Sequence, residues 1–146
     1  MNNSPLLSSG TESPYEILKV CEDLATSPKD MIACYAYGPS YFFSSNPGDW
    51  RGAMKFCQDA NLGEYLYPCM NGIGMQVAKE YMSDFRMVEE ICGVLPVGME
   101  ERLGAACFSS ALQYYMLTKG IDHVAVELCS GLDTFRAKCL KHTTGH

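Results

Sequence analysis

Eight cysteines are spaced so regularly along this chain of 146 residues that they divide it into similar segments. Every second cysteine recurs after 35 to 37 residues, and the four between them recur after 32 to 38 residues. A period of this length is typical of two-helix repeats, in which each repeat packs against the next. The first set is Cys21, Cys57, Cys92 and Cys129, and the second is Cys34, Cys69, Cys107 and Cys139.

Each cysteine of the first set lies in a segment whose apolar residues follow helical spacing. Counted from the residue four before the cysteine, positions 0, 3, 4 and 7 are apolar in all four segments, as in Ile17, Val20, Cys21 and Leu24. This spacing is that of the buried stripe of an amphipathic helix. The predicted helices, called B helices below, cover residues 16–24, 52–60, 87–95 and 124–132.

The second set of cysteines marks another group of predicted helices, in which an apolar residue directly follows each cysteine. These A helices cover residues 31–43, 66–78, 104–116 and 136–146. Capping residues support the starts, because a Ser or Asn before Pro, or an Asp, is a favoured helix N-terminus. The predicted starts are Ser13-Pro14, Ser27-Pro28, Asn46-Pro47, Asp84 and Asp122.

Together the segments predict an all-α fold of stacked antiparallel helical hairpins, similar to an α-solenoid. The order is B, A–B, A–B, A–B, A, so the chain begins and ends in half a hairpin. We expect a flexible leader at residues 1–12, one helical-repeat domain at 13–140 and a flexible tail at 141–146. A chain of this length suffices for a single hydrophobic core.

Gly72 and Gly74 interrupt the A helix at 66–78 and raise the question of a phosphate-binding loop. A dinucleotide fingerprint needs a preceding strand, a helix that opens after the turn and a further glycine, and the sequence shows none of these. We therefore interpret both glycines as small residues that let a neighbouring helix approach closely.

The cysteines allow two disulfide registers along the same rim of the stack. Pairing across the B-to-A junctions would join 21 with 34, 57 with 69, 92 with 107 and 129 with 139. Pairing within A–B hairpins would join 34 with 57, 69 with 92 and 107 with 129, and would leave 21 and 139 unpaired. Each bridge would stabilise the fold by about 2 to 4 kcal/mol. Reduced, buried thiols are the alternative, as in cytosolic proteins.

Charge limits the classes of partner. The formal net charge is −6, and no Lys or Arg cluster forms a stripe that could follow a phosphate backbone, so we expect no nucleic-acid partner. Polar residues interrupt every apolar stretch, so we expect no membrane-spanning helix. Disulfides would place the protein outside the cytoplasm, in a secreted, periplasmic or organellar space, whereas free thiols would indicate the cytoplasm.

The sequence offers no catalytic dyad, because its three histidines do not stand in register with a nucleophile. The adjacent carboxylates Glu89 and Glu90 are interpreted as a solvated face. We expect no cofactor and no metal. The one cluster with ligand chemistry is Cys139, His142 and His146, at the end of the chain.

Tyrosines recur on or just before the A helices. Tyrosine combines a large contact area with a polar tip, and protein interfaces are enriched in it. These side chains could equally fill the core between hairpins. The candidates for a binding surface are Tyr35, Tyr37, Tyr41, Tyr65, Tyr67, Tyr114 and Tyr115.

The layout resembles the cysteine-rich SEL1-like repeat proteins, which are relatives of the tetratricopeptide solenoids. The pairs Cys34/Cys57, Cys69/Cys92 and Cys107/Cys129 carry this likeness over residues 28–132, and residues 114–128 share a tyrosine, a glycine and an alanine with the family's repeat. The resemblance implies a secreted or periplasmic solenoid that binds proteins or peptides. It transfers no catalytic residue.

The expected function is therefore a non-catalytic binding or scaffold module for a protein or peptide. Self-association or association with flanking repeats would follow from the half-hairpins at both ends. The alternative is a protein or enzyme that binds a small ligand or a metal in a Tyr- and Met-lined pocket between hairpins.

Overall fold

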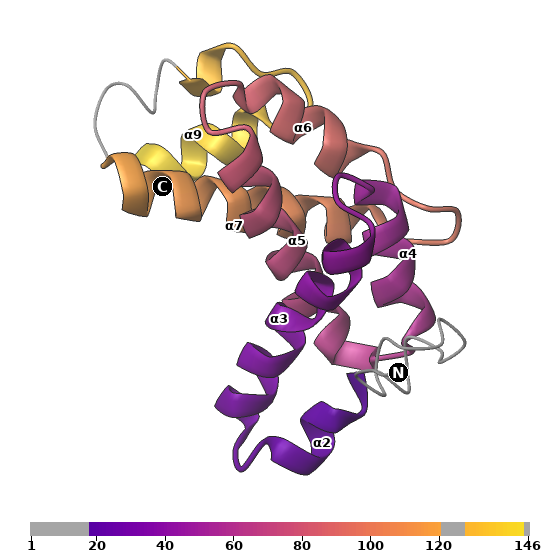
Figure 1. Ribbon diagram of the computed structural model, residues 1–146. Helices are drawn as coiled ribbons and strands as arrows, with labels where there is room; N and C mark the ends of the chain where they lie inside the picture. The colour runs from indigo at the N-terminus through magenta and orange to yellow at the C-terminus, as the bar shows by residue number, and fades with distance from the viewer. Residues whose placement is uncertain (1–17, 121–127, 145–146) are drawn as a thin grey trace.

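The computed structural model describes residues 18–120 and 128–144, without the side chains of residues 138 and 142–144 (Figure 1). All regular structure in this part of the chain is helical, which confirms the predicted all-α class. Its elements are α2 (Val20–Leu24), α3 (Pro28–Ser45), α4 (Trp50–Asp59), the 3₁₀ turn η1 (Gly63–Tyr65), α5 (Leu66–Glu80), α6 (Phe85–Gly93), α7 (Glu101–Lys119) and α9 (Arg136–Thr144). A helical turn at residues 128–130 contains Cys129.

Helix α3 begins where the sequence predicts. Pro28 is its first residue, and the Ser27 side chain accepts a hydrogen bond from the backbone N–H of Asp30 at 3.1 Å. The Asp30 carboxylate in turn accepts the Thr26 hydroxyl at 2.7 Å. Side chains thus occupy the first turn of α3 as caps, which satisfies backbone donors that a helix start leaves without partners.

The predicted start of α4 at Asn46-Pro47 is wrong. Helix α4 begins at Trp50, and Asp49 caps it by accepting the Gly52 N–H at 3.0 Å. Asn46 instead ends α3, where its side-chain amide donates to the Phe42 carbonyl at 3.1 Å. Gly48 has φ +81 between them, a left-handed conformation that reverses the chain before α4 can start.

The predicted domain boundaries fall only partly within the described residues. The leader 1–12 and the starts at Ser13 and Asp122 lie outside them. At the other end, α9 continues to Thr144, within the range 136–146 predicted for the last A helix, and the flexibility of residues 141–146 stays a prediction.

Helix α5 lies at the centre of the molecule. It contacts α3 and α7, and it also contacts the shorter helices α4 and α6. Figure 1 shows α2 and α3 extending toward one end, with α6, α7 and α9 at the other. None of the helices in residues 18–120 and 128–144 is long and apolar enough to cross a bilayer.

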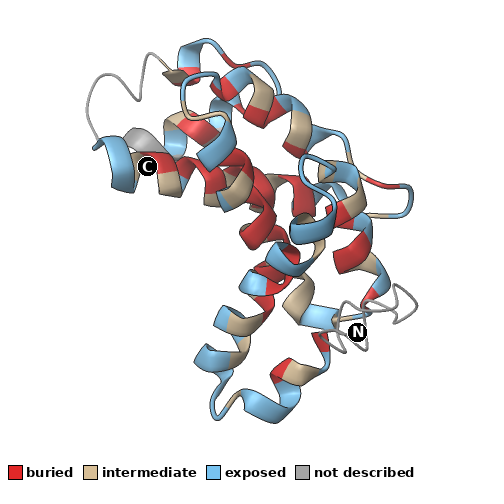
Figure 2. Cartoon of the chain, in the orientation of Figure 1, coloured by how far each residue is buried: buried red, intermediate tan, exposed pale blue. Residues whose placement is uncertain are grey.

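Burial follows this arrangement (Figure 2). Eight of the 15 residues of α5 are buried, whereas only three of the 18 residues of α3 are. The buried side chains form one cluster that runs from α2 to α9 and includes seven of the cysteines. The described residues therefore share one core, to which α5 and α7 contribute most.

The two glycines of α5 confirm the packing interpretation. A Cβ at Gly72 would overlap the backbone carbonyl of Ala36 in α3, and a Cβ at Gly74 would overlap the carbonyl of Cys107 in α7. Glycine therefore lets α5 approach both long neighbours at backbone distance. Beside this contact, the Ser110 hydroxyl donates to the Asn71 carbonyl at 2.8 Å. The phosphate-loop alternative has no structural support at this position.

Candidate functional site

All eight cysteines form disulfides, and the register is the one across the B-to-A junctions. The pairs are Cys21–Cys34, Cys57–Cys69, Cys92–Cys107 and Cys129–Cys139, with Cα–Cα distances of 5.7, 5.9, 5.6 and 5.4 Å. The alternative register within A–B hairpins is wrong. Each bridge joins a B helix to the A helix that follows it, so the covalent unit of this fold is the B–A pair.

The disulfide at the C-terminal end changes the candidate metal site. Cys139 bonds to Cys129 and so has no thiolate to offer a metal. The side chains of His142 and His146 lie outside the described residues. Among the described residues, no group of three or more His, Cys, Asp or Glu side chains lies close enough to hold a metal ion.

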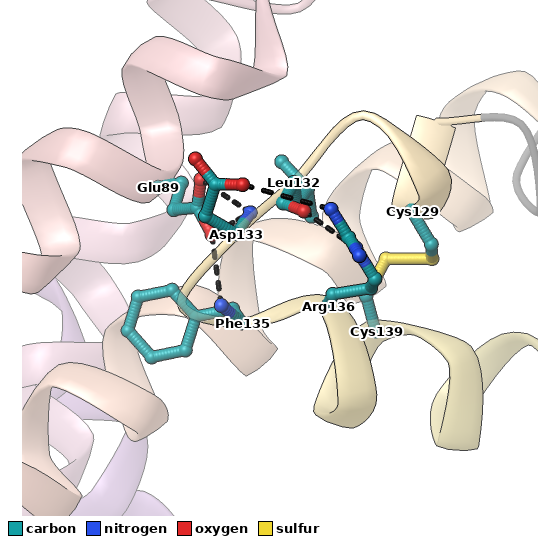
Figure 3. Close-up of a disulfide and its surroundings, with 7 residues drawn as sticks. All are labelled: Glu89, Cys129, Leu132, Asp133, Phe135, Arg136 and Cys139. Atoms are coloured by element: carbon teal, nitrogen blue, oxygen red, sulfur yellow. Dashed lines mark hydrogen bonds and ion pairs between the residues drawn. A yellow bond between two sulfur atoms is a disulfide. The ribbon is translucent and has the colours of Figure 1, made fainter.

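Glu89 contacts the loop between the two cysteines of this disulfide and is not part of a solvated face (Figure 3). Its side chain is buried, and its carboxylate accepts the backbone N–H of Asp133 at 2.9 Å and that of Phe135 at 2.8 Å. The carboxylate thereby attaches α6 to the loop that leads into α9. The sequence does contain the signal: Glu89 lies directly after buried Val88 and three residues before Cys92, on the inner side of α6.

The seven candidate tyrosines divide into three groups. Tyr35 and Tyr115 are buried, so they cannot contribute to a binding surface. Tyr65, Tyr67 and Tyr114 are half-buried and contact neighbouring helices: Tyr65 stacks on Tyr35, Arg102 lies over Tyr67, and Lys79 lies over Tyr114. Tyr37 and Tyr41, both on α3, remain exposed, with 71% and 37% of their surface accessible.

Tyr37 and Tyr41 belong to an exposed stripe along α3 that has no charge. Because residues three, four, seven and eight apart share one face of a helix, five exposed residues line up along it. We call this the α3 stripe, and its members are Ala33, Tyr37, Ser40, Tyr41 and Ser44. Residues 31–48 contain no Asp, Glu, Lys or Arg, although the whole chain carries a net charge of −6.

The exposed faces of the B helices differ in chemistry from the α3 stripe. Helix α4 presents Arg51, Lys55 and Asp59 to solvent, with Lys55 and Asp59 paired at 3.2 Å. Helix α6 presents Arg86 and Glu90. Charged residues of both signs are the ordinary covering of a solvated helix face. A neutral face of this length that carries tyrosines, such as the α3 stripe, is unusual for a helix face that only contacts solvent.

A pocket of about 590 Å³ lies between α5 and α7. It too is lined only by uncharged residues, among them Met75, Leu112, Gln113 and Met116. The sequence predicts a Tyr- and Met-lined pocket between hairpins. This one has the methionines, whereas its polar lining comes from amide and hydroxyl groups (Asn71, Ser109, Ser110 and Gln113). Its volume is in the range of pockets that hold small ligands.

A charged group, Asp30, lies in the first turn of α3, directly before the uncharged stretch 31–48. Hydrogen bonds from Thr26, first from its hydroxyl and then from its backbone N–H, lower the pKa of Asp30 below its ordinary value of 3.8. In the first turn of α7, the hydrogen bond to Glu100 and the negative charge of that carboxylate raise the pKa of Arg102. Both groups are therefore fully charged at neutral pH, and both lie outside the neutral stretch 31–48.

Comparison of this chain with protein-family models, with curated proteins and with solved structures found no match. The resemblance to SEL1-like repeats therefore stays a prediction, and any function must be argued from the site.

Proposed function

We propose that this protein is a non-catalytic helical-repeat module that binds another protein through the exposed surface of its A helices. The observation that carries the proposal is the α3 stripe, where two exposed tyrosines lie on a helix face without charge. Protein interfaces are enriched in tyrosine and depleted of charged residues at their centres. A face of this composition can be buried without desolvating an ion.

The helical arrangement supports the repeat part of the proposal. The A helices α3, α5 and α7 contact one another in chain order, and each is bonded by a disulfide to the B helix before it. In a solenoid, each repeat contacts mainly its neighbours, and one helix layer provides the binding surface. Helix α5 has a long helix on each flank, α3 and α7, whereas α3 has only α5. A partner on the α3 stripe would cover α3 in the way that α7 covers α5.

Four disulfides in a short chain support a site of action outside the cytoplasm, in a secreted, periplasmic or organellar space. Mass spectrometry of the protein isolated from its native source, with free thiols blocked at lysis, tests this part. Four bridges in the junction register are expected. Eight alkylated thiols would place the protein in a reducing compartment.

Site-specific photo-crosslinking tests the binding proposal. A photoreactive phenylalanine analogue replaces Tyr37 in one variant and Lys55, on the charged face of α4, in a matched control. We expect a discrete crosslinked product from position 37 in the native source and none from position 55. The Tyr41→Glu substitution should abolish that product. Equal crosslinking from both positions, or none from position 37, would overturn the proposal.

The same experiment identifies the partner class. If the crosslinked product has twice the mass of the chain, the partner is a second copy, and the α3 stripe mediates self-association. Sedimentation equilibrium over a range of concentrations would then show a dimer that Tyr41→Glu dissociates. If the product contains peptides of another protein, the module is a heterologous binder.

The pocket between α5 and α7 favours a second candidate function, the binding of a small apolar ligand by Met75 and Met116. Methionine side chains adapt to irregular ligands because they are flexible and polarizable. Methyl-labelled methionine NMR tests this directly: a ligand in the pocket should shift the Met75 and Met116 signals and leave the buried Met54 unchanged. Ligand-dependent shifts spread over all methionines would contradict a specific site.

A further inference from the structure

A second pocket, of about 600 Å³, lies where α3, α4 and α5 meet. Three aromatic side chains from three different elements line it. Phe43 comes from the last turn of α3, Trp50 is the first residue of α4, and Tyr81 is the C-cap of α5. The sequence motifs do not reveal this group, because its members belong to three different elements.

The rings form a continuous aromatic wall. The centroids of Phe43 and Trp50 are 5.0 Å apart with a T-shaped arrangement, and those of Trp50 and Tyr81 are 6.4 Å apart with planes tilted by 59°. All three side chains are half-buried and border the pocket, so part of each ring remains available to a ligand.

Aromatic faces of this kind attract cations. The face of a ring carries partial negative charge, and a cation within about 6 Å of the centroid is stabilised by it, most strongly over tryptophan. A quaternary ammonium ion gains most, because its methyl groups pack on the rings and it loses less hydration than a metal ion or a primary amine. Recognition of such ions is an established functional use of cation–π contacts.

The charges around the pocket fit a cation. Glu80 lines the pocket next to Tyr81, and the chain as a whole has a net charge of −6. Lys79 is the one lysine or arginine among the described residues that line it, and its Nζ lies 5.9 Å from the ring centroid of Tyr114 on α7. That contact directs its charge toward the neighbouring helix. Gln76 supplies a neutral polar group at the rim.

We propose that Phe43, Trp50 and Tyr81 form a binding site for the trimethylammonium group of a small molecule, with Glu80 as the countercharge. The shared chemistry is a quaternary nitrogen that carries three methyl groups. Choline and the phosphocholine headgroup of a lipid are two sources of it. The site is separate from the α3 stripe and does not depend on the proposed binding of a protein there.

Fluorescence titration of the full chain tests the proposal, because Trp50 is its only tryptophan. Choline should change the Trp50 emission in a saturable manner. The neutral isostere 3,3-dimethyl-1-butanol has the same shape without the charge and should bind about tenfold more weakly. Sodium chloride at equal ionic strength controls for screening and should give no saturable change. Phosphocholine in a parallel titration distinguishes the two sources.

Substitutions locate the site. Tyr81→Leu should weaken choline binding about tenfold, Glu80→Gln should weaken it to a smaller extent, and Lys79→Gln should strengthen it. Glu64→Gln is the matched control for Glu80→Gln, because it removes an exposed carboxylate that does not line the pocket. Isothermal titration calorimetry measures choline binding without relying on Trp50 fluorescence. If Tyr81→Leu does not fold, Tyr81→Phe takes its place, because this variant keeps the aromatic ring.

Equal affinity for choline and its neutral isostere would overturn the proposal and define the pocket as merely apolar. The proposal also fails if saturable binding is absent, or if binding is unchanged in both Tyr81→Leu and Glu80→Gln. If choline does not bind and a proline-rich peptide shifts the Trp50 emission, the aromatic wall serves peptide recognition instead.

Discussion

Helices α3 and α5 have similar composition, but they differ in how far neighbouring helices cover them. Each is bonded to a preceding B helix by a disulfide, and each contains a long stretch without charge. Helix α5 has a long helix on either flank, and eight of its residues are buried, whereas α3 has a long helix on one flank and buries three. The difference shows that neutral composition alone does not make a core helix. A helix becomes part of the core when neighbouring helices cover it on both flanks.

The contact between α5 and α7 should give the largest effect. Gly74→Val places a side chain against the Cys107 carbonyl, and because two helix backbones must separate to admit it, the free energy of unfolding should fall by more than about 3 kcal/mol. Ser40→Val on the α3 stripe is the matched control and should change it by less than about 0.5 kcal/mol. Urea denaturation followed by circular dichroism measures both. Similar losses in the two variants would mean that the α3 stripe is also covered.

Two tyrosines within α3 sharpen the same comparison inside one helix. Tyr35 is buried and stacks on Tyr65 with ring centroids 5.0 Å apart, so Tyr35→Ala should cost about 3 kcal/mol. Tyr37→Ala, two residues away and exposed, should cost less than about 0.5 kcal/mol. The same denaturation experiment measures this pair. Equal costs would show that Tyr37 is packed in solution.

The disulfides should differ in their resistance to reduction. Cys34 is half-buried, whereas Cys57 and Cys69 are completely buried. A thiolate must reach a sulfur atom to break the bond, so Cys21–Cys34 should be reduced first by a low concentration of dithiothreitol. Alkylation and mass spectrometry at successive times give the order. If Cys57–Cys69 opens earlier, the α4–α5 pair separates more readily than its burial indicates.

The smallest effect concerns the cap of α3. Because the pKa of Asp30 is lowered in the fold, its carboxylate stabilises the protein above its ordinary pKa of 3.8, and this contribution is lost as pH falls through the lowered value. Wild type should therefore melt at a slightly higher temperature than Asp30→Asn at pH 7, and the difference should disappear at strongly acidic pH. Thermal melts across that range measure it. A difference that persists in acid would mean that the charge is not involved.

Local patterns in the sequence predict the helices well, because an amphipathic stripe and a capping residue act over a few residues. The cap at Ser27 and the close packing at Gly72 and Gly74 are confirmed for this reason. The sequence does not decide between the two disulfide registers, since both place the sulfur atoms on one rim. Tyr35 and Tyr37 likewise look alike in sequence, and only the packing of neighbouring elements, such as Tyr65 of η1 on Tyr35, separates buried from exposed.

Features that depend on several distant segments escape such local patterns. The pocket at Phe43, Trp50 and Tyr81 forms from three elements, and no spacing rule connects them. The interpretation of Glu89 as solvated is wrong because its partners are backbone groups 44 and 46 residues away. The predicted cap at Asn46 is wrong because Asp49 offers the better cap once Gly48 has turned the chain.

The order of the bridges has a consequence for synthesis. Each bridge joins two cysteines that are consecutive along the chain, at a sequence separation of at most 15. Ribosomes deliver the amino terminus first, so oxidation in order of emergence yields the native set directly. Such a polypeptide has no nested linkages to isomerise, and each finished pair leaves no thiol behind to compete with the next.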